Sequence, residues 1–171
     1  LDLAHTRIGF SARHAMVSKV RGAFNEFDGS VHLDTENPAN SHVEIDIKAD
    51  SIDTRNADRD NHLRSNDFLA MNEYPQITFR STAVEQLDDS HYRVTGDLEI
   101  RGVTRPVNID FEFTGSATDP WGNLRVGFEG GATINRKDWG VSWNAALEAG
   151  GVMVSDKVNL EFEVEAVKVA A

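Results

Sequence analysis

Histidines and arginines are the residues of this chain whose types and positions could do chemistry. His14 follows Phe10 at an even spacing, and Arg59 and Arg64 lie in a charged stretch of an otherwise acidic chain. A histidine beside apolar residues can meet the polar group of a bound molecule, and arginines bind anionic groups through paired hydrogen bonds. Each also has a structural interpretation, with His14 hydrogen-bonded inside the protein and the arginines paired with aspartates one helical turn away.

Metal binding and catalysis lack a sequence signature. The six histidines form no His-x-His or His-Glu-x-x-His pattern, and His62 with Asp58 provides at most two ligands where a metal site needs three or four. The chain has no cysteine, which removes thiolate ligands and cysteine nucleophiles. Neither a Gly-x-Ser-x-Gly elbow nor a glycine-rich phosphate loop occurs. We therefore expect a protein that is not an enzyme and has no metal site or cofactor.

The composition fits one acidic domain. The chain has 171 residues, with 17 Lys and Arg against 28 Asp and Glu, and a formal net charge of -11. This charge disfavours nucleic-acid partners, because their phosphates repel an acidic surface. The apolar runs fall far short of the roughly 18 residues of a transmembrane helix, so we expect no such segment and a single domain over residues 1–171. Because Leu1 is not an initiator residue, the sequence leaves the compartment open.

The elements that must position these side chains are mainly strands. Apolar and polar residues alternate most clearly over residues 158–165, and again over 43–48, 92–100 and 107–113. Such a period of two is typical of strands with one buried face. Short turn-forming segments link the strands, which predicts antiparallel neighbours. The exception is a charged stretch around residues 54–71, whose spacing predicts a short helical insertion.

An antiparallel meander of this kind must bury its apolar face, and the chain offers no second layer of helices to cover it. The sequence therefore predicts an all-β fold, a single extended antiparallel barrel of about eight strands that carries the helical insertion. Nine of the aromatic residues are phenylalanine, whose ring needs no hydrogen bond. Such a barrel is either filled by its own side chains or hollow enough for a small apolar ligand.

Several segments carry a resemblance to a known family. The most specific are Arg59-Asp60-Asn61-His62-Leu63-Arg64-Ser65, Tyr74-Pro75 and Ile77-Thr78-Phe79-Arg80-Ser81, and further matches are Arg101-Gly102-Val103-Thr104 and Asn135-Arg136. On these segments the chain resembles the YceI-like family of lipocalin-like polyisoprenoid-binding proteins, along essentially its whole length. The resemblance implies an extended barrel around an elongated apolar pocket that holds long isoprenoids or other amphiphilic lipids.

We therefore expect non-catalytic binding, sequestration or transport of a lipid such as a polyisoprenoid or an isoprenoid quinone. The residues expected to bind the ligand are six along the lumen and two arginines at its mouth: Phe10, His14, Phe24, Phe79, Phe111, Phe162, Arg59 and Arg64. Two alternatives stay open, an enzyme or enzyme accessory acting on isoprenoid quinones or related lipids, and a filled structural barrel without a ligand. The sequence also leaves open which lipid is bound and whether the chain forms a homodimer.

Overall fold

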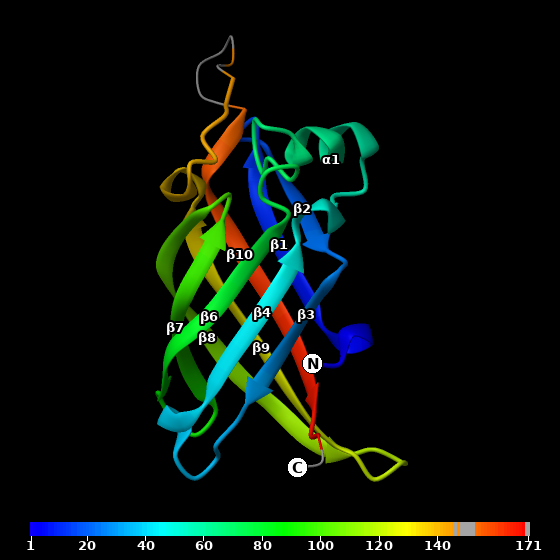
Figure 1. The fold of residues 1–171 in the computed structure, drawn as a ribbon, viewed down its shortest axis with the longest axis vertical. Coiled ribbons are helices and arrows are strands. Elements are labelled where there is room, and N and C mark those ends of the chain that lie inside the picture. The colour runs from blue at the N-terminus through cyan, green and yellow to red at the C-terminus, as the bar shows by residue number, and fades with distance from the viewer. Residues whose placement is uncertain (146, 148–152, 170–171) are drawn as a thin grey trace.

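Long antiparallel strands form nearly all of the wall of this protein (Figure 1). The computed structural model describes residues 1–145, 147 and 153–169. In this part of the chain the strands are β1 (Arg7–His14), β2 (Ser18–Phe24), β3 (Phe27–His32), β4 (His42–Lys48), β5 (Ile52–Asp53), β6 (Gln76–Gln86), β7 (His91–Ile100), β8 (Val103–Thr118), β9 (Leu124–Asn135) and β10 (Val154–Val167).

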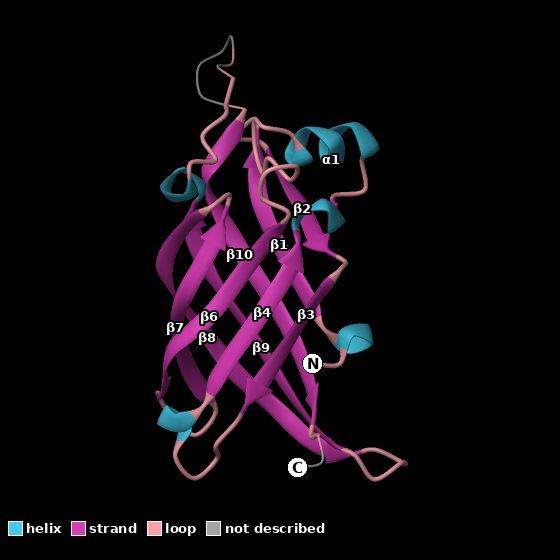
Figure 2. Ribbon diagram, in the orientation of Figure 1, coloured by secondary structure: helices cyan, strands magenta, loops and turns pink. Residues whose placement is uncertain are grey.

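The helical segments are short and lie at the ends and sides of the strand wall (Figure 2). They are the α-helix α1 (Ala57–Arg64) and the 3-10 turns η1 (Leu3–His5), η2 (Pro38–Asn40), η3 (Ala49–Ser51) and η4 (Arg136–Trp139). The predicted helical insertion is confirmed as α1, which begins after Asn56, whose side-chain oxygen accepts a hydrogen bond from the amide of Arg59. No helix among the described residues is long and apolar enough to cross a membrane.

The strands pair in the order β3-β4-β6-β7-β8-β9-β10-β1-β2-β5, and every described pair is antiparallel. The sheet curls into an elongated barrel, as the sequence predicts, and strands β3 and β5 are its two edges (Figure 1). The described sheet has ten strands where the sequence predicts about eight. The difference arises partly because β5 has only two residues.

Alternation within the strands directs one set of side chains into the barrel. The segment predicted from residues 158–165 is part of β10, and those from 92–100 and 107–113 lie in β7 and β8. Buried apolar residues from facing strands, including Ile8, Phe79 and Ile109, form a continuous core cluster along the wall. Strands β8 and β10 have 16 and 14 residues, so at roughly 3.3 Å per residue they extend for roughly 53 and 46 Å.

Candidate functional site: an apolar cavity in the barrel

An apolar cavity of about 280 Å³ occupies the inside of the barrel. Its lining begins at Leu63 and Phe68, beside α1, and reaches Val31 and Leu33 at the far end of β3. The polar side chains among the described lining residues are few: Thr6, Ser41, Tyr92, Arg136 and the indole of Trp139. A long cavity with this lining accepts an apolar chain and offers few partners for hydrogen bonds.

Five of the phenylalanines predicted to line the lumen do lie on the cavity wall: Phe10, Phe24, Phe79, Phe111 and Phe162. The rings of Phe10 and Phe24 are 5.8 Å apart between centroids, and those of Phe111 and Phe162 are 6.0 Å apart. Most of these inward-pointing side chains are only partly buried, because they face the cavity rather than other side chains. Their contact with a ligand stays a prediction.

Glycines on neighbouring strands make room for these rings. A Cβ atom built on Gly22 would lie 2.5 Å from Phe10 Cζ, and one on Gly130 would lie 2.5 Å from Phe111 Cδ1. Gly22 and Gly130 are the cross-strand partners of those two phenylalanines. Each ring therefore lies flat over a position without a side chain, which keeps the ring against the wall and the lumen open.

His14 does not lie in the lumen, so that part of the sequence prediction is wrong. Its side chain is exposed and is absent from the cavity lining. The alternation puts His14 in phase with Phe10, but β1 ends at His14, and its pairing with β10 is interrupted by a bulge after Ala12. The alternation of inward and outward side chains along β1 is predicted correctly, but the cavity lining on this strand ends at Ala12, before His14.

Arg59 and Arg64 are not on the described cavity lining, and their contact with a ligand headgroup stays a prediction. Arg59 donates from Nε to Thr54 Oγ1 at 2.7 Å and from Nη2 to the Thr54 carbonyl at 2.6 Å. Arg64 donates from Nε to the Asp50 carbonyl at 2.8 Å and from Nη2 to the Ile52 carbonyl at 3.0 Å. Both guanidinium groups therefore fasten α1 to the chain before it, through backbone carbonyl oxygens and the Thr54 hydroxyl rather than through the aspartates on the helix.

At the end of the cavity beside α1 lies a cluster that the sequence reasoning missed. The ring of His62 lies 5.0 Å from that of Phe68 and 4.6 Å from that of Trp143, and its Nε2 is 2.8 Å from Asp67 Oδ2. We call this end, marked by α1, Phe68 and Trp143, the cap end. Trp143 comes from a distant segment, so no local spacing in the sequence places it beside His62 and Phe68.

Arg136 is the charged side chain on the cavity lining, and its hydrogen bonds are directed to the backbone. Its guanidinium donates to the carbonyls of Val141, Trp143, Val154 and Ser155 at 2.7–3.3 Å. Burial lowers the pKa of this arginine from its usual value, because desolvation disfavours the charged form. With its donors occupied in this way, Arg136 joins the segments at the cap end rather than presenting a free charge to the lumen.

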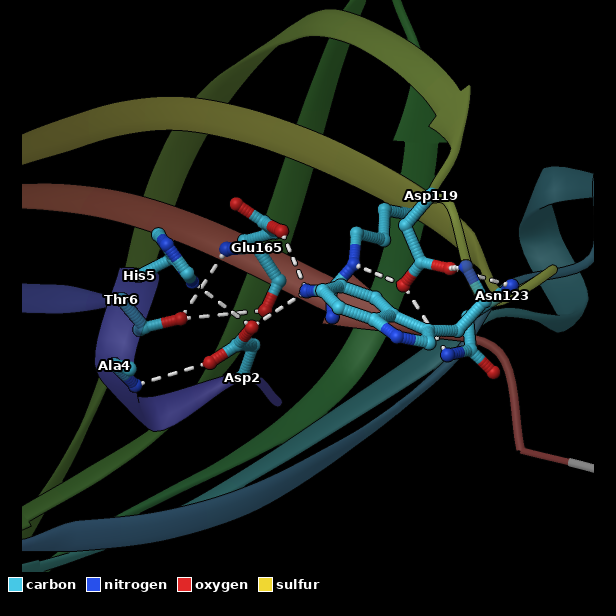
Figure 3. Close-up of polar contacts among 9 residues, drawn as sticks. Asp2, Ala4, His5, Thr6, Asp119, Asn123 and Glu165 are labelled. Carbon is cyan, nitrogen blue, oxygen red and sulfur yellow. Dashed lines mark hydrogen bonds and ion pairs between the residues drawn. The ribbon is translucent and has the colours of Figure 1, made fainter.

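A cluster of charged groups lies at the opposite end of the barrel (Figure 3). Asp2, His5 and Glu165 are close enough together to hold a metal ion, but a guanidinium already lies among the carboxylates. Arg125 Nη1 donates to Asp2 Oδ2 at 2.6 Å and to Glu165 Oε1 at 2.8 Å, and its Nε donates to Asp119 Oδ2 at 2.9 Å. This arginine clamp ties η1, the β8–β9 turn and β10 together.

The clamp lowers the pKa of two of its carboxyl groups. Hydrogen bonds from His5 and then Arg125 lower the pKa of Asp2 to about 2, and the backbone amide of Asn123 is the largest cause that lowers the pKa of Asp119 to about 2. The same contact with Asp2 raises the pKa of His5 above its usual value. These carboxyl groups lie outside the cavity lining, so their titration is a matter of stability.

An elongated antiparallel barrel around an apolar lumen defines a lipocalin-like class of protein. Within that class, the chain belongs to the YceI-like domain family, whose sequence model matches residues 1–166. The chain is 41% identical over 164 residues to a UPF0312 protein of Pseudomonas aeruginosa, which covers 96% of this chain and 82% of that relative. A UPF0312 protein of Pectobacterium atrosepticum is 43% identical over 138 residues, covering 81% of this chain and 71% of the relative.

Solved structures share the fold. The YceI protein of Campylobacter jejuni has a TM-score of 0.80 at 32% identity, covering 99% of this chain and 97% of that one. BcnA of Burkholderia cenocepacia has a TM-score of 0.86 at 24% identity, covering 97% and 99%. A polyisoprenoid-binding domain from Saccharophagus degradans, implicated in plant cell wall breakdown, has a TM-score of 0.72 at 14% identity, covering 96% and 95%. At these last two identities the likeness concerns the fold alone.

Proposed function

We propose that this protein binds a long-chain isoprenoid or a similar amphiphilic lipid in the barrel cavity, and that it sequesters or carries the lipid without catalysing a reaction. The observation that carries the proposal is the cavity itself, which extends along the barrel and is lined almost entirely by aliphatic and aromatic side chains. Each methylene that a ligand buries there contributes about 0.8 kcal/mol, so a long chain binds without specific polar contacts.

The polar groups of the lumen support a binding role rather than catalysis. Arg136 is occupied by backbone carbonyls, and the Trp139 indole donates to the Leu98 carbonyl at 2.9 Å. The carboxyl groups with pKa values near 2, Asp2 and Asp119, belong to the arginine clamp and not to the cavity lining. An acid or base for a reaction would need a strongly shifted group facing the ligand. The solved neighbour that is named a polyisoprenoid-binding domain adds support for the class of ligand.

The direct experiment is native mass spectrometry of protein purified from its own host, followed by organic extraction of any bound molecule. We expect a co-purifying apolar chain. Delipidated protein should regain mass and thermal stability when an isoprenoid quinone is added, since ligand binding stabilises the folded state. The quinone should be recovered unchanged.

A matched pair of variants tests whether the lipid lies in the lumen. Ala12 lines the cavity, so Ala12→Phe should lower the amount of bound lipid, whereas Glu163→Phe places the same ring on an exposed outward position of β10 and should not. The proposal fails if host protein repeatedly carries no lipid and added lipid gives no stabilisation. Equal lipid binding by both variants would exclude the lumen as the site.

A further inference from the structure

The turn between β1 and β2 exposes two large apolar side chains. Met16 is 66% exposed and Val17 is 82% exposed. The amide of Val17 donates to the His14 carbonyl at 3.0 Å, which closes a tight turn and holds both residues at its tip. Apolar side chains displayed at a hairpin tip add nothing to the core, and such surfaces mark sites of interaction.

The backbone of this turn is strained by its own sequence. Ala15 and Met16 have φ angles of 50° and 61°, in the left-handed region that tight hairpin turns require and that glycine or asparagine fills best. Non-glycine residues there raise the energy of the folded state. The requirements of the turn therefore do not account for a methionine at its exposed tip.

Cations without partners lie on the strands below the tip. Arg13 on β1, Lys19 and Arg21 on β2, and Lys157 on β10 are all exposed. Within the described part of the chain, none of their side chains donates a hydrogen bond or forms an ion pair, although acidic residues outnumber basic ones by 28 to 17. Four unpaired cations on one face of such a protein form a local basic surface.

Three of these cations surround a shallow depression in the outer wall. Arg13, Lys19 and Lys157 line it, together with Ser11, whose buried hydroxyl has no hydrogen-bond partner among the described residues. The depression lies at the bulge in the pairing of β1 with β10. Asp156 also lines it, but its carboxylate is 3.3 Å from Lys137 Nζ, so its charge is offset. The depression can therefore accept an anionic group between cations.

The hairpin tip belongs to the cap end of the barrel. His14 pairs with Val154, which lines the cavity, and the amide of Ala15 donates to the Met153 carbonyl at 2.7 Å. In Figure 1, β1 ends at the top of the barrel beside α1. An apolar tip with cations directly below it matches the two layers of a membrane surface, acyl chains beneath anionic headgroups.

The opposite end of the barrel also has an exposed apolar tip, but the charged groups around it are mainly carboxylates. Trp121, in the β8–β9 turn, is 80% exposed. Close to it are the carboxylates of the arginine clamp, Asp2, Asp119 and Glu165, which share one guanidinium. An anionic surface repels this end, so charge distinguishes the two hairpin tips.

We propose that the β1–β2 hairpin docks the cap end of the barrel on an anionic lipid bilayer. Met16 and Val17 enter the interface, and Arg13, Lys19, Arg21 and Lys157 face the lipid phosphates. The proposal uses exposed residues outside the cavity, so it stands or fails independently of lipid binding in the lumen.

The experiment is flotation of the delipidated full chain with vesicles of phosphatidylglycerol and phosphatidylcholine, with phosphatidylcholine vesicles and inorganic phosphate as comparisons. The protein should float with the anionic vesicles and not with the neutral ones. Added salt should weaken the binding, because it screens exposed charges. Lys19→Gln with Arg21→Gln should lower the partition coefficient about 30-fold, at about 1 kcal/mol for each cation near the surface.

Met16→Asn with Val17→Thr removes the apolar tip while placing asparagine in a left-handed position that suits it. This variant should lose vesicle binding at least tenfold and keep or raise its unfolding midpoint, and Trp121→Ala at the other tip should bind like the wild type. Three results would overturn the proposal. They are equal binding to neutral and anionic vesicles, equal losses for the two tip variants, and a concentration-dependent dimer that disappears in the Met16→Asn, Val17→Thr variant while vesicles go unbound. A fourth result would also overturn it: inorganic phosphate that binds to the protein while no vesicle does would show a phosphate site and no membrane surface.

Discussion

Replacing Phe111 by alanine distinguishes a hollow barrel from a filled one. Phe111 lies on the cavity wall over Gly130, and the ring of Phe162 is its aromatic neighbour at 6.0 Å. The remaining face of the ring is turned to the cavity and is only partly buried. Truncation therefore removes contacts on one side of the ring and few on the other.

The size of the expected loss follows from those contacts. In a filled core, Phe→Ala costs about 3–5 kcal/mol, which combines lost transfer free energy with a new void. At Phe111 the void already exists, so we expect the free energy of unfolding to fall by about 1–2 kcal/mol, including about 0.5–1.5 kcal/mol for the aromatic pair. Phe68 provides the comparison: it also reaches the cavity lining, but it is 5% exposed and packs against His62 and Trp143. Phe68→Ala should cost about 3–5 kcal/mol.

Urea unfolding of delipidated wild type and both variants measures these losses, and repeating it with a long-chain isoprenoid measures the ligand effect. Lipid at 100 times its dissociation constant should stabilise the wild type by about 2.7 kcal/mol, and Phe111→Ala should reduce that gain. Equal large losses at Phe111 and Phe68, with no lipid-dependent gain in the wild type, would show that the barrel is packed solid. Lipid binding in the lumen would then be refuted.

Three further variants test features around the cavity. Asp60→Ala removes the buried carboxylate that accepts hydrogen bonds from the Thr54 amide and hydroxyl, so it should lower the free energy of unfolding by about 1–3 kcal/mol in urea titrations, whereas the exposed Asp58→Ala should change it little. Arg125→Gln should lower the urea midpoint at pH 7. Because the pKa values of Asp2 and Asp119 are lowered from 3.8 to about 2, the stability they add is present above pH 3.8 and is lost as the pH falls through about 2, so the variant and the wild type should converge there. Gly22→Ala should push the Phe10 ring into the lumen and reduce bound lipid measured by native mass spectrometry, and adding Phe10→Leu should restore it; unchanged lipid in Gly22→Ala would contradict this account of the wall.

Strand alternation predicts the inward face of this barrel because it is a local property. In β8 and β10, neighbours of opposite polarity fix the direction of Phe111 and Phe162, and both rings lie on the cavity wall. The barrel itself follows from the lack of any helical layer over the apolar face. The strand count is less predictable, because a strand of two residues such as β5 exists only through its pairing with β2.

The surroundings of the predicted site residues that do not line the cavity cannot be read from residue spacing. The bulge after Ala12 arises where β10 pairs with β1, and the sequence near His14 does not predict it. Most partners of Arg59 and Arg64 are backbone carbonyls, which every residue type provides, and the others are the uncharged side chains of Thr54 and Asn61, so charge spacing cannot identify them. The sequence pattern favours the carboxylates on the same helix as partners of these arginines, but the structure shows other partners.

The glycines that lie under the phenylalanine rings allow the width of the cavity to change without any change in the side chains that a ligand would contact. A single methyl group at Gly22 would tilt the ring of Phe10, on the neighbouring strand, into the lumen. The methyl group would lie between the barrel wall and the ring, so it would narrow the cavity without changing the ring itself. Two barrels with identical ligand-contacting side chains can thus differ in cavity width and accept ligands of different cross-section. A comparison of the ligand-contacting side chains alone would not reveal the glycine substitution that causes the difference.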